Sequence, residues 1–226
     1  MALSRQELLR LPNQLYVEGK NDLHITLQLL MQFTNGSENN PPLHINEKSG
    51  KDNILSKPKF IQTVLDTETI RAVGFVLDAD DNPKGRWESI RSQLAAIDSS
   101  IAVDLPATGL IHLLPDDKRV GVWIMPDNRS NGAIETLCAK LIPDEQSRVW
   151  DYTETAIITA KNRGATWRNP EDRDKARIHS YLAWQSEPGT PPGLALKTRL
   201  LDGQASGAKS YMDWVLELFR LPRLPV

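Results

Sequence analysis

The sequence has few of the residues that mark disulfide-bonded, zinc-binding or membrane-spanning proteins. Cys138 is the single cysteine among 226 residues, which excludes an internal disulfide. Neither this cysteine nor the four histidines have the spacing of zinc ligands. No apolar run approaches the roughly 18 residues of a membrane-spanning helix, and no signal-peptide pattern follows Met1. We therefore expect a cytoplasmic protein with no membrane partner.

The chain also lacks an excess of charge of either sign. It has 27 basic against 29 acidic residues, a formal net charge of −2. This balance argues against a polybasic nucleic-acid coat, whose affinity comes from a large positive excess. It still allows a local cluster of charge, because a sum does not say where charges gather. With 40% apolar and 25% charged residues, the composition is typical of a packed globular chain.

Hydrophobic periodicity predicts alternating strands and helices over the first two thirds of the chain. The run at residues 72–77 is apolar throughout, as in a strand buried on both faces of a parallel sheet. The expected strands are residues 14–17, 43–47, 72–77, 109–114 and 119–125, and the expected helices are 4–10, 20–33, 58–65, 84–97 and 130–141. This succession predicts an α/β fold with a mostly parallel sheet flanked by helices.

The last third of the sequence changes character. Residues 146–162, 171–185 and 207–219 each have a helical pattern, and glycines or a Pro-Gly pair separate them. We therefore expect two parts: an α/β domain over residues 1–145, and a helical C-terminal extension over residues 146–226 that packs on it.

Acidic residues follow three of the expected strands. Glu18 follows the first, Asp78 and Asp80 follow the buried strand, and Asp127 follows the last. Because ligands bind beyond the carboxyl ends of parallel strands, these acids are expected to meet at one edge of the sheet. Several carboxylates cannot all stay ionised there without a cation, and oxygen ligands suit Mg²⁺ or Mn²⁺. The pattern therefore predicts metal-dependent phosphoryl transfer or phosphodiester cleavage.

Two of these acidic segments resemble the signatures of a known family. Val-Glu-Gly-Lys-Asn-Asp at residues 17–22 resembles the motif that opens the Toprim domain of topoisomerases, bacterial primases and OLD-family nucleases. Asp78-Ala79-Asp80 resembles the second Toprim motif, an Asp-x-Asp pair. The resemblance covers about residues 12–142. It is closest to small stand-alone Toprim-like proteins of unknown function that are related to OLD-family nucleases.

The resemblance implies a role for each acid. Glu18 would be the general base or a metal ligand, and Asp78 and Asp80 the principal Mg²⁺ ligands. Lys20 would meet a phosphate at a helix N-terminus. Three further acids complete the expected ligand set: Asp22, one helical turn after Glu18, and Asp127 and Glu135, which resemble the later acids of nuclease-type Toprim proteins.

The activity implied by the resemblance is a Mg²⁺- or Mn²⁺-dependent nuclease, in phage defence or DNA processing. Nucleic acid is then the expected partner. The sequence has no Walker A pattern, so an ATPase working with it would be a separate protein. A second copy of the chain is a further candidate partner.

Other interpretations of the same residues stay open. A Toprim-like module could bind nucleic acid or a partner protein without cutting. Asp78 and Asp80 also resemble the nucleophile and acid of haloacid-dehalogenase-type phosphatases, although Asn82 stands where that family favours Thr or Val. Asp22, Asp127 and Glu135 also fit acids at helix ends or on exposed helix faces, with no metal role.

Cations interleave with an aromatic residue between residues 161 and 179. This pattern could follow a nucleic-acid backbone and stack a base on Trp167. Glu171, Asp172 and Asp174 interrupt it and favour a helix surface crossed by salt bridges.

Overall fold

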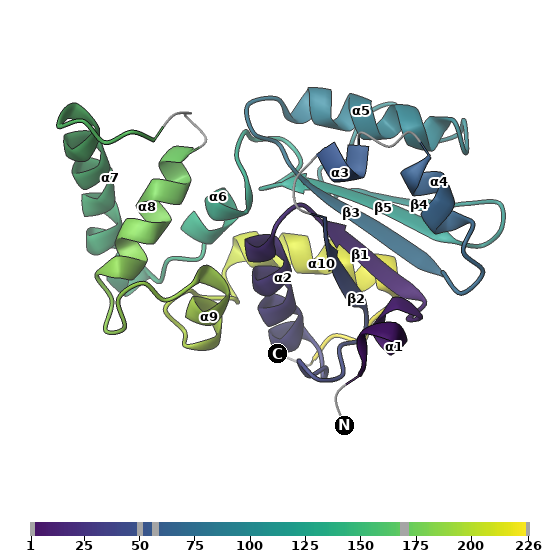
Figure 1. The fold of residues 1–226 in the computed structure, drawn as a ribbon, viewed down its shortest axis with the longest axis horizontal. Helices are drawn as coiled ribbons and strands as arrows, with labels where there is room; N and C mark the ends of the chain where they lie inside the picture. Colours follow the sequence, from purple (N-terminus) through teal and green to yellow (C-terminus); the bar gives the residue numbers. More distant parts are fainter. Residues whose placement is uncertain (1–2, 49–51, 56–58, 168–171, 225–226) are drawn as a thin grey trace.

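A five-stranded sheet forms the centre of the protein (Figure 1). The computed structural model describes residues 3–48, 52–55, 59–167 and 172–224. Within these residues the strands are β1 (Asn13–Val17), β2 (His44–Glu47), β3 (Ala72–Asp78), β4 (Leu110–Leu113) and β5 (Arg119–Met125). They lie in the order β2-β1-β3-β5-β4, and all neighbours are parallel except β4, which is antiparallel to β5. The predicted α/β fold with a mostly parallel sheet is confirmed.

Helices lie on both faces of the sheet (Figure 1). One face is covered by α3 (Asp52–Leu55), α4 (Phe60–Leu65) and α5 (Pro83–Ala95), and the other by α2 (Lys20–Phe33) and α10 (Ser206–Phe219). The remaining described helices are α1 (Arg5–Leu9), α6 (Ile134–Ala139), α7 (Ser147–Asn162), α8 (Asp172–Ala183) and α9 (Pro192–Lys197), with a 3₁₀ turn at Asp144–Gln146. None of these described helices has the length and apolar character needed to cross a bilayer. Two apolar clusters, one on each face, form the core around the sheet.

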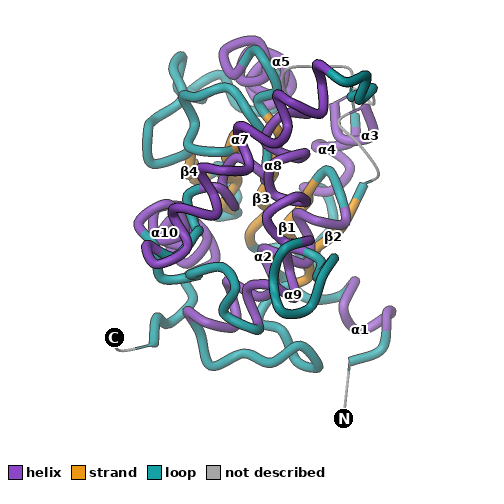
Figure 2. Tube along the Cα trace, turned by 90° about the vertical axis from the view of Figure 1, so that its left-hand side faces the viewer, coloured by secondary structure: helices purple, strands orange, loops and turns teal. Residues whose placement is uncertain are grey.

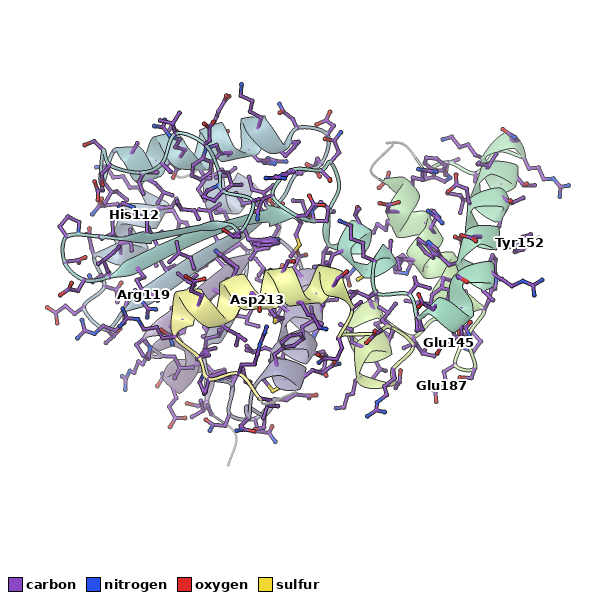
Figure 3. The ribbon with its side chains drawn as sticks, turned by 180° about the vertical axis from the view of Figure 1, so that it is seen from behind. His112, Arg119, Glu145, Tyr152, Glu187 and Asp213 are labelled. Carbon is purple, nitrogen blue, oxygen red and sulfur yellow. The ribbon has the colours of Figure 1, made fainter. Side chains whose placement is uncertain are left out.

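The last helix, α10, is part of the core of the sheet. It lies along the back of the sheet (Figure 3), where Trp214 and Leu218 pack over Gly74 and Gly121. These glycines are cross-strand partners in β3 and β5. A Cβ at Gly121 would lie only 2.6 Å from Leu218 Cδ2, so the missing side chains let the helix approach the strands closely.

By contrast, α7 and α8 pack against each other at the side of the sheet. Figure 2 looks onto this side and shows the two helices next to each other in front of the strands. α8 also contacts α6, so it lies between α7 and α6 (Figure 1). Tyr152, on the outer helix α7, is exposed and lies far from the sheet (Figure 3).

The helix expected over residues 130–141 is shorter in the structure, where α6 spans Ile134–Ala139. The reason is a turn that follows β5. Asp127 Oδ1 accepts hydrogen bonds from the backbone N–H groups of Arg129 at 3.2 Å and Ser130 at 2.8 Å, and these bonds compete with helix formation.

The sequence did not predict α9. Pro192 begins this helix, and proline is tolerated at the first helical position because its missing N–H would have no helical partner there. Ala195 and Leu196 are fully buried, so packing supports the helix. The first residues expected for the helices at 58–65 and 171–185 lie outside the described residues.

Candidate functional site

A pocket of about 410 Å³ opens at the carboxyl ends of β1 and β3. The described residues that line it are Glu18, Gly19, Lys20, Asn21, Asp22, Asp78, Glu135 and Lys175. They come from the loop after β1, the end of β3, the first turns of α2 and α6, and α8. Four carboxylates and two lysines therefore share one small space.

The parallel pairing of β1 and β3 brings the first two acids together. Glu18 follows β1 directly, and Asp78 is the last residue of β3. The backbone N–H of Asp78 donates a hydrogen bond to Glu18 Oε1 at 3.2 Å. A Cβ at Gly19 would lie 3.0 Å from Asp22 Oδ2, so the glycine leaves room for the Asp22 carboxylate to lie against the turn.

The start of α6 brings a further acid to the pocket. The backbone N–H of Ile134 donates a hydrogen bond to Asp78 Oδ1 at 3.2 Å. Asn21 Nδ2 donates a hydrogen bond to Glu135 Oε1, also at 3.2 Å. These two bonds join α6 to β3 and to α2, and they orient two of the four carboxylates.

Asp22 is the most desolvated of the four acids, with 4% of its surface exposed. Within the described residues, its Oδ1 atom is buried without a hydrogen-bond partner. Burial, followed by the charges of Glu135 and Glu18, raises the pKa of Asp22 to about 8, although the backbone N–H groups of Asp22 and Gly19 act in the opposite direction. An ionised Asp22 is therefore unfavourable unless a cation or a donor reaches it.

Asp78 is held in the same environment. Desolvation raises its pKa well above the usual range, and so do the charges of Asp22, Glu18, Glu135 and Asp80. The four pocket acids therefore cannot all be ionised near neutral pH without a compensating positive charge.

Asp80 was predicted to be a principal metal ligand, but its side chain pairs with the guanidinium of Arg86 and does not line the pocket. Its Oδ2 atom lies 2.5 Å from Arg86 Nη2, and Arg86 Nε donates to the Asp78 carbonyl oxygen at 2.9 Å. The Asp80 backbone is left-handed, with φ of 52°, and forms a two-way hydrogen-bonded bridge with Gly132. Asp80 lies near enough to the pocket to raise the pKa of Asp78, but its carboxylate is directed to Arg86.

Asp127 is likewise not brought into the pocket. Its Oδ2 atom accepts a hydrogen bond from Lys140 Nζ at 2.7 Å, and its Oδ1 atom caps the turn at Ser130. Burial alone would raise the pKa of Asp127, but Lys140 and Ser130 together hold it below its usual range. Of the acids predicted to gather at this edge, the structure unites Glu18, Asp22, Asp78 and Glu135 and leaves Asp80 and Asp127 outside.

The ligand atoms that the pocket offers are of the chemical type that a hard divalent cation prefers. The pocket offers only carboxylate and amide oxygens, and Asp22 Oδ1 has no other partner among the described residues. In position the fit is looser, because within the described ranges no three His, Cys, Asp or Glu side chains surround a common point. Glu18 Oε1 and Asp78 Oδ1 each accept a hydrogen bond from a backbone N–H group, so binding of a shared cation through these two atoms would require the side chains to rotate.

Sequence reasoning missed the contribution of α8 to the pocket. The basic stretch at residues 161–179 was the only signal. Two of its cations form salt bridges with an acid of the neighbouring helix: Arg173 and Arg177 lie 2.5 Å and 3.3 Å from the carboxylate oxygens of Glu154 on α7. Lys175 lines the acidic pocket instead.

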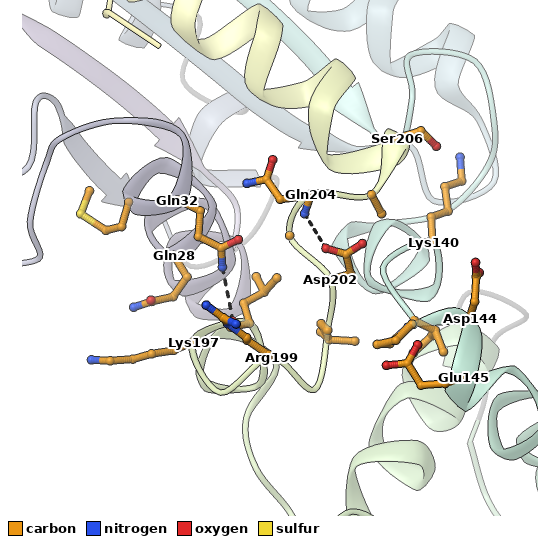
Figure 4. Close-up of a pocket in the computed structure, with 17 residues that line it drawn as sticks. Gln28, Gln32, Lys140, Asp144, Glu145, Lys197, Arg199, Asp202, Gln204 and Ser206 are labelled. Carbon is orange, nitrogen blue, oxygen red and sulfur yellow. Dashed lines mark hydrogen bonds between the residues drawn. The ribbon is translucent and has the colours of Figure 1, made fainter. Parts of the chain in front are cut away.

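A larger hollow, of about 1020 Å³, lies between α2, α9 and the start of α10 (Figure 4). Its charges are mixed, and its lysines are engaged: Lys140 pairs with Asp127, and Lys197 pairs with Glu38. Asp202 accepts the backbone N–H of Gln204 at 2.8 Å (Figure 4). Because the lining of this hollow gathers no charge of one sign, the smaller acidic pocket is the better candidate site.

Comparison with known proteins places the chain in one family. A model described as a protein of unknown function (DUF3226) matches residues 12–220, which include the sheet, the acidic pocket and all the helices from α2 to α10. The searches of curated proteins and of solved structures returned no match.

Proposed function

Because the chain belongs to the DUF3226 family, whose function is unknown, we propose its function from the pocket: a Mg²⁺- or Mn²⁺-dependent hydrolase of nucleic-acid phosphodiesters. One observation carries the proposal. Four carboxylates share a pocket with two exposed lysines, and one buried oxygen of Asp22 has no hydrogen-bond partner among the residues that the structure describes. Such a pocket favours a divalent cation among the acids and an anionic substrate at the lysines. The Toprim resemblance of residues 17–22 and 78–80 supports the same activity.

Asp78 and Glu135 would hold the metal ion, with Asp22 adding a further carboxylate to the same cluster, and Glu18 would serve as the general base beside them. A bound divalent ion at such a site neutralises phosphate charge and lowers the pKa of a bound water. The chain itself orients the ligands, since the N–H groups of Asp78 and Ile134 and the amide of Asn21 fix three carboxylates.

The substrate phosphate would be received at the start of α2. Gly19, before the helix, provides no side-chain cap, so in the described part of the chain the backbone N–H groups of Lys20 and Asn21 remain available to an anion. Lys20 is exposed beside them and lines the pocket. In the proposed reaction Glu18 accepts the proton of the attacking water as the water oxygen bonds to phosphorus, and Lys20 stabilises negative charge on the phosphate. The bond from phosphorus to the leaving oxygen breaks, and that oxygen takes a proton from solvent water.

The wider setting belongs to the same proposal. Nucleic acid is the proposed substrate, and phage defence or DNA processing in the cytoplasm is the proposed context. A separate ATPase and a second copy of the chain are the proposed candidates for assembly.

The test is a cleavage assay with plasmid, single-stranded DNA and RNA, each with Mg²⁺, Mn²⁺ or EDTA. We expect cleavage of at least one polymer in a divalent metal, loss of cleavage in EDTA, and recovery when metal is returned. Binding without cleavage of any polymer would favour a non-catalytic module. Turnover of p-nitrophenyl phosphate through an aspartyl-phosphate at Asp78 would favour the phosphatase alternative.

A further inference from the structure

The α7–α8 pair directs one cation toward the acidic pocket. On α8, Arg173 and Arg177 are four residues apart and both bind Glu154 of α7. Arg177 also lies over the ring of Trp150, 3.9 Å from its centroid. Lys175 is two residues from each arginine, about 200° around the helix, and so lies on the opposite face of α8. Since α8 lies between α7 and α6 (Figure 1), this face is turned toward α6, in agreement with the place of Lys175 in the lining of the pocket.

Lys175 lines the pocket, but no described acid of the pocket forms an ion pair with this lysine. Within the described part of the chain, Lys175 forms no salt bridge or side-chain hydrogen bond, and the same holds for Lys20. Both lysines are exposed. Two ammonium groups from different helices therefore border the acidic pocket and stay available to an external anion.

We propose that Lys175 binds a phosphate of the polynucleotide next to the one that is cleaved, while Lys20 serves the cleaved phosphate. This inference rests on the proposed function. The substrate backbone would then bridge the start of α2 and the α7–α8 pair, across the pocket. An ammonium group is a compact point charge that suits a phosphate without selecting a base. The bound substrate is therefore a chain with at least two consecutive phosphates, read without sequence preference at this contact.

The test measures binding and cleavage of a fluorescein-labelled oligonucleotide at several salt concentrations. We expect Lys175→Gln to weaken binding about tenfold. The slope of log K against log salt should become less negative by about 0.7, the value for one phosphate contact on a single strand. KM should rise more than kcat falls. Lys175→Arg should restore most of the affinity. Lys209→Gln, an exposed lysine on α10 outside the pocket, should match the wild type.

Two outcomes separate this inference from the proposed function. A wild-type protein that binds but does not cut contradicts the hydrolase proposal, while the salt slope of Lys175→Gln still tests the phosphate contact. A slope equal to that of the wild type, or a loss of affinity equal to that of Lys209→Gln, would overturn the role of Lys175. Thermal melting of each variant verifies that the fold is retained.

Discussion

Replacing Asp22 with asparagine is expected to make the metal-free protein more stable at pH 8. The folded protein raises the pKa of Asp22 to about 8, chiefly through burial. The protonated form is thus favoured by the fold. Protonated Asp22 makes its full contribution to the free energy of unfolding below the unfolded-state pKa of about 4. This contribution is lost as the pH rises from there through about 8. Asparagine keeps the shape of the side chain and carries no charge, so the variant avoids this loss.

We expect the free energy of unfolding of Asp22→Asn to exceed that of the wild type by about 1–3 kcal/mol at pH 8, and to come close to it at about pH 3.5, below the unfolded-state pKa. Urea denaturation at both pH values measures this difference. Asp151→Asn, an exposed acid on α7, is the matched control and should change stability at neither pH. A variant less stable than the wild type at pH 8 would show that the backbone hydrogen bonds to the ionised carboxylate dominate.

The same substitution should weaken the stabilisation by Mg²⁺. A cation that binds the folded state raises its stability by mass action, and loss of one carboxylate from the cluster reduces its affinity. The buried Asp22 carboxylate would thus decrease the stability of the metal-free protein and increase its affinity for the metal ion. Such a trade-off between stability and function is common at functional sites.

Asp78→Asn is expected to lower kcat for oligonucleotide cleavage by roughly a thousandfold. Asp78 is the acid that connects the cluster: its backbone donates to Glu18, and its side chain accepts from the start of α6. Asparagine is nearly isosteric, so the effect should come from lost charge and metal binding rather than from unfolding.

Asp80→Asn is the matched control for this substitution, two residues along the same loop. Because Asp80 is directed to Arg86, we expect its substitution to lower kcat by less than about tenfold. Cleavage rates of both variants in Mg²⁺ decide between the two acids. If Asp80→Asn proved the more damaging change, the catalytic centre would lie around Asp80, as the sequence motif alone implied.

Sequence periodicity predicted those helices and strands whose own residues carry a clear hydrophobic pattern. The helix at residues 20–33 and the apolar strand that ends at Asp78 were predicted because their own side chains specify period and burial. α9 was missed because Pro192 and Gly193 indicate a loop locally, while the packing of Leu196 that supports the helix is non-local.

The residues of the candidate site also fall into two groups: those that the sequence could predict and those whose position depends on tertiary packing. Glu18 and Asp78 could be predicted to meet because parallel strands end at one edge of a sheet. The exclusion of Asp127 depends on its ion pair with Lys140, which lies at the C-terminal end of α6. The presence of Lys175 depends on how α8 packs beside α6, which no sequence motif encodes.

The central claim is that the acidic pocket holds a divalent cation, and calorimetric titration of Mn²⁺ at pH 7 tests it most directly. Because the pKa values of Asp22 and Asp78 are raised, metal binding should release protons, so the measured heat should vary with the ionisation enthalpy of the buffer. We predict saturable binding with proton release in the wild type and at least about tenfold weaker binding in Asp78→Asn. No binding to the wild type, or equal binding without proton release in both proteins, would contradict the claim.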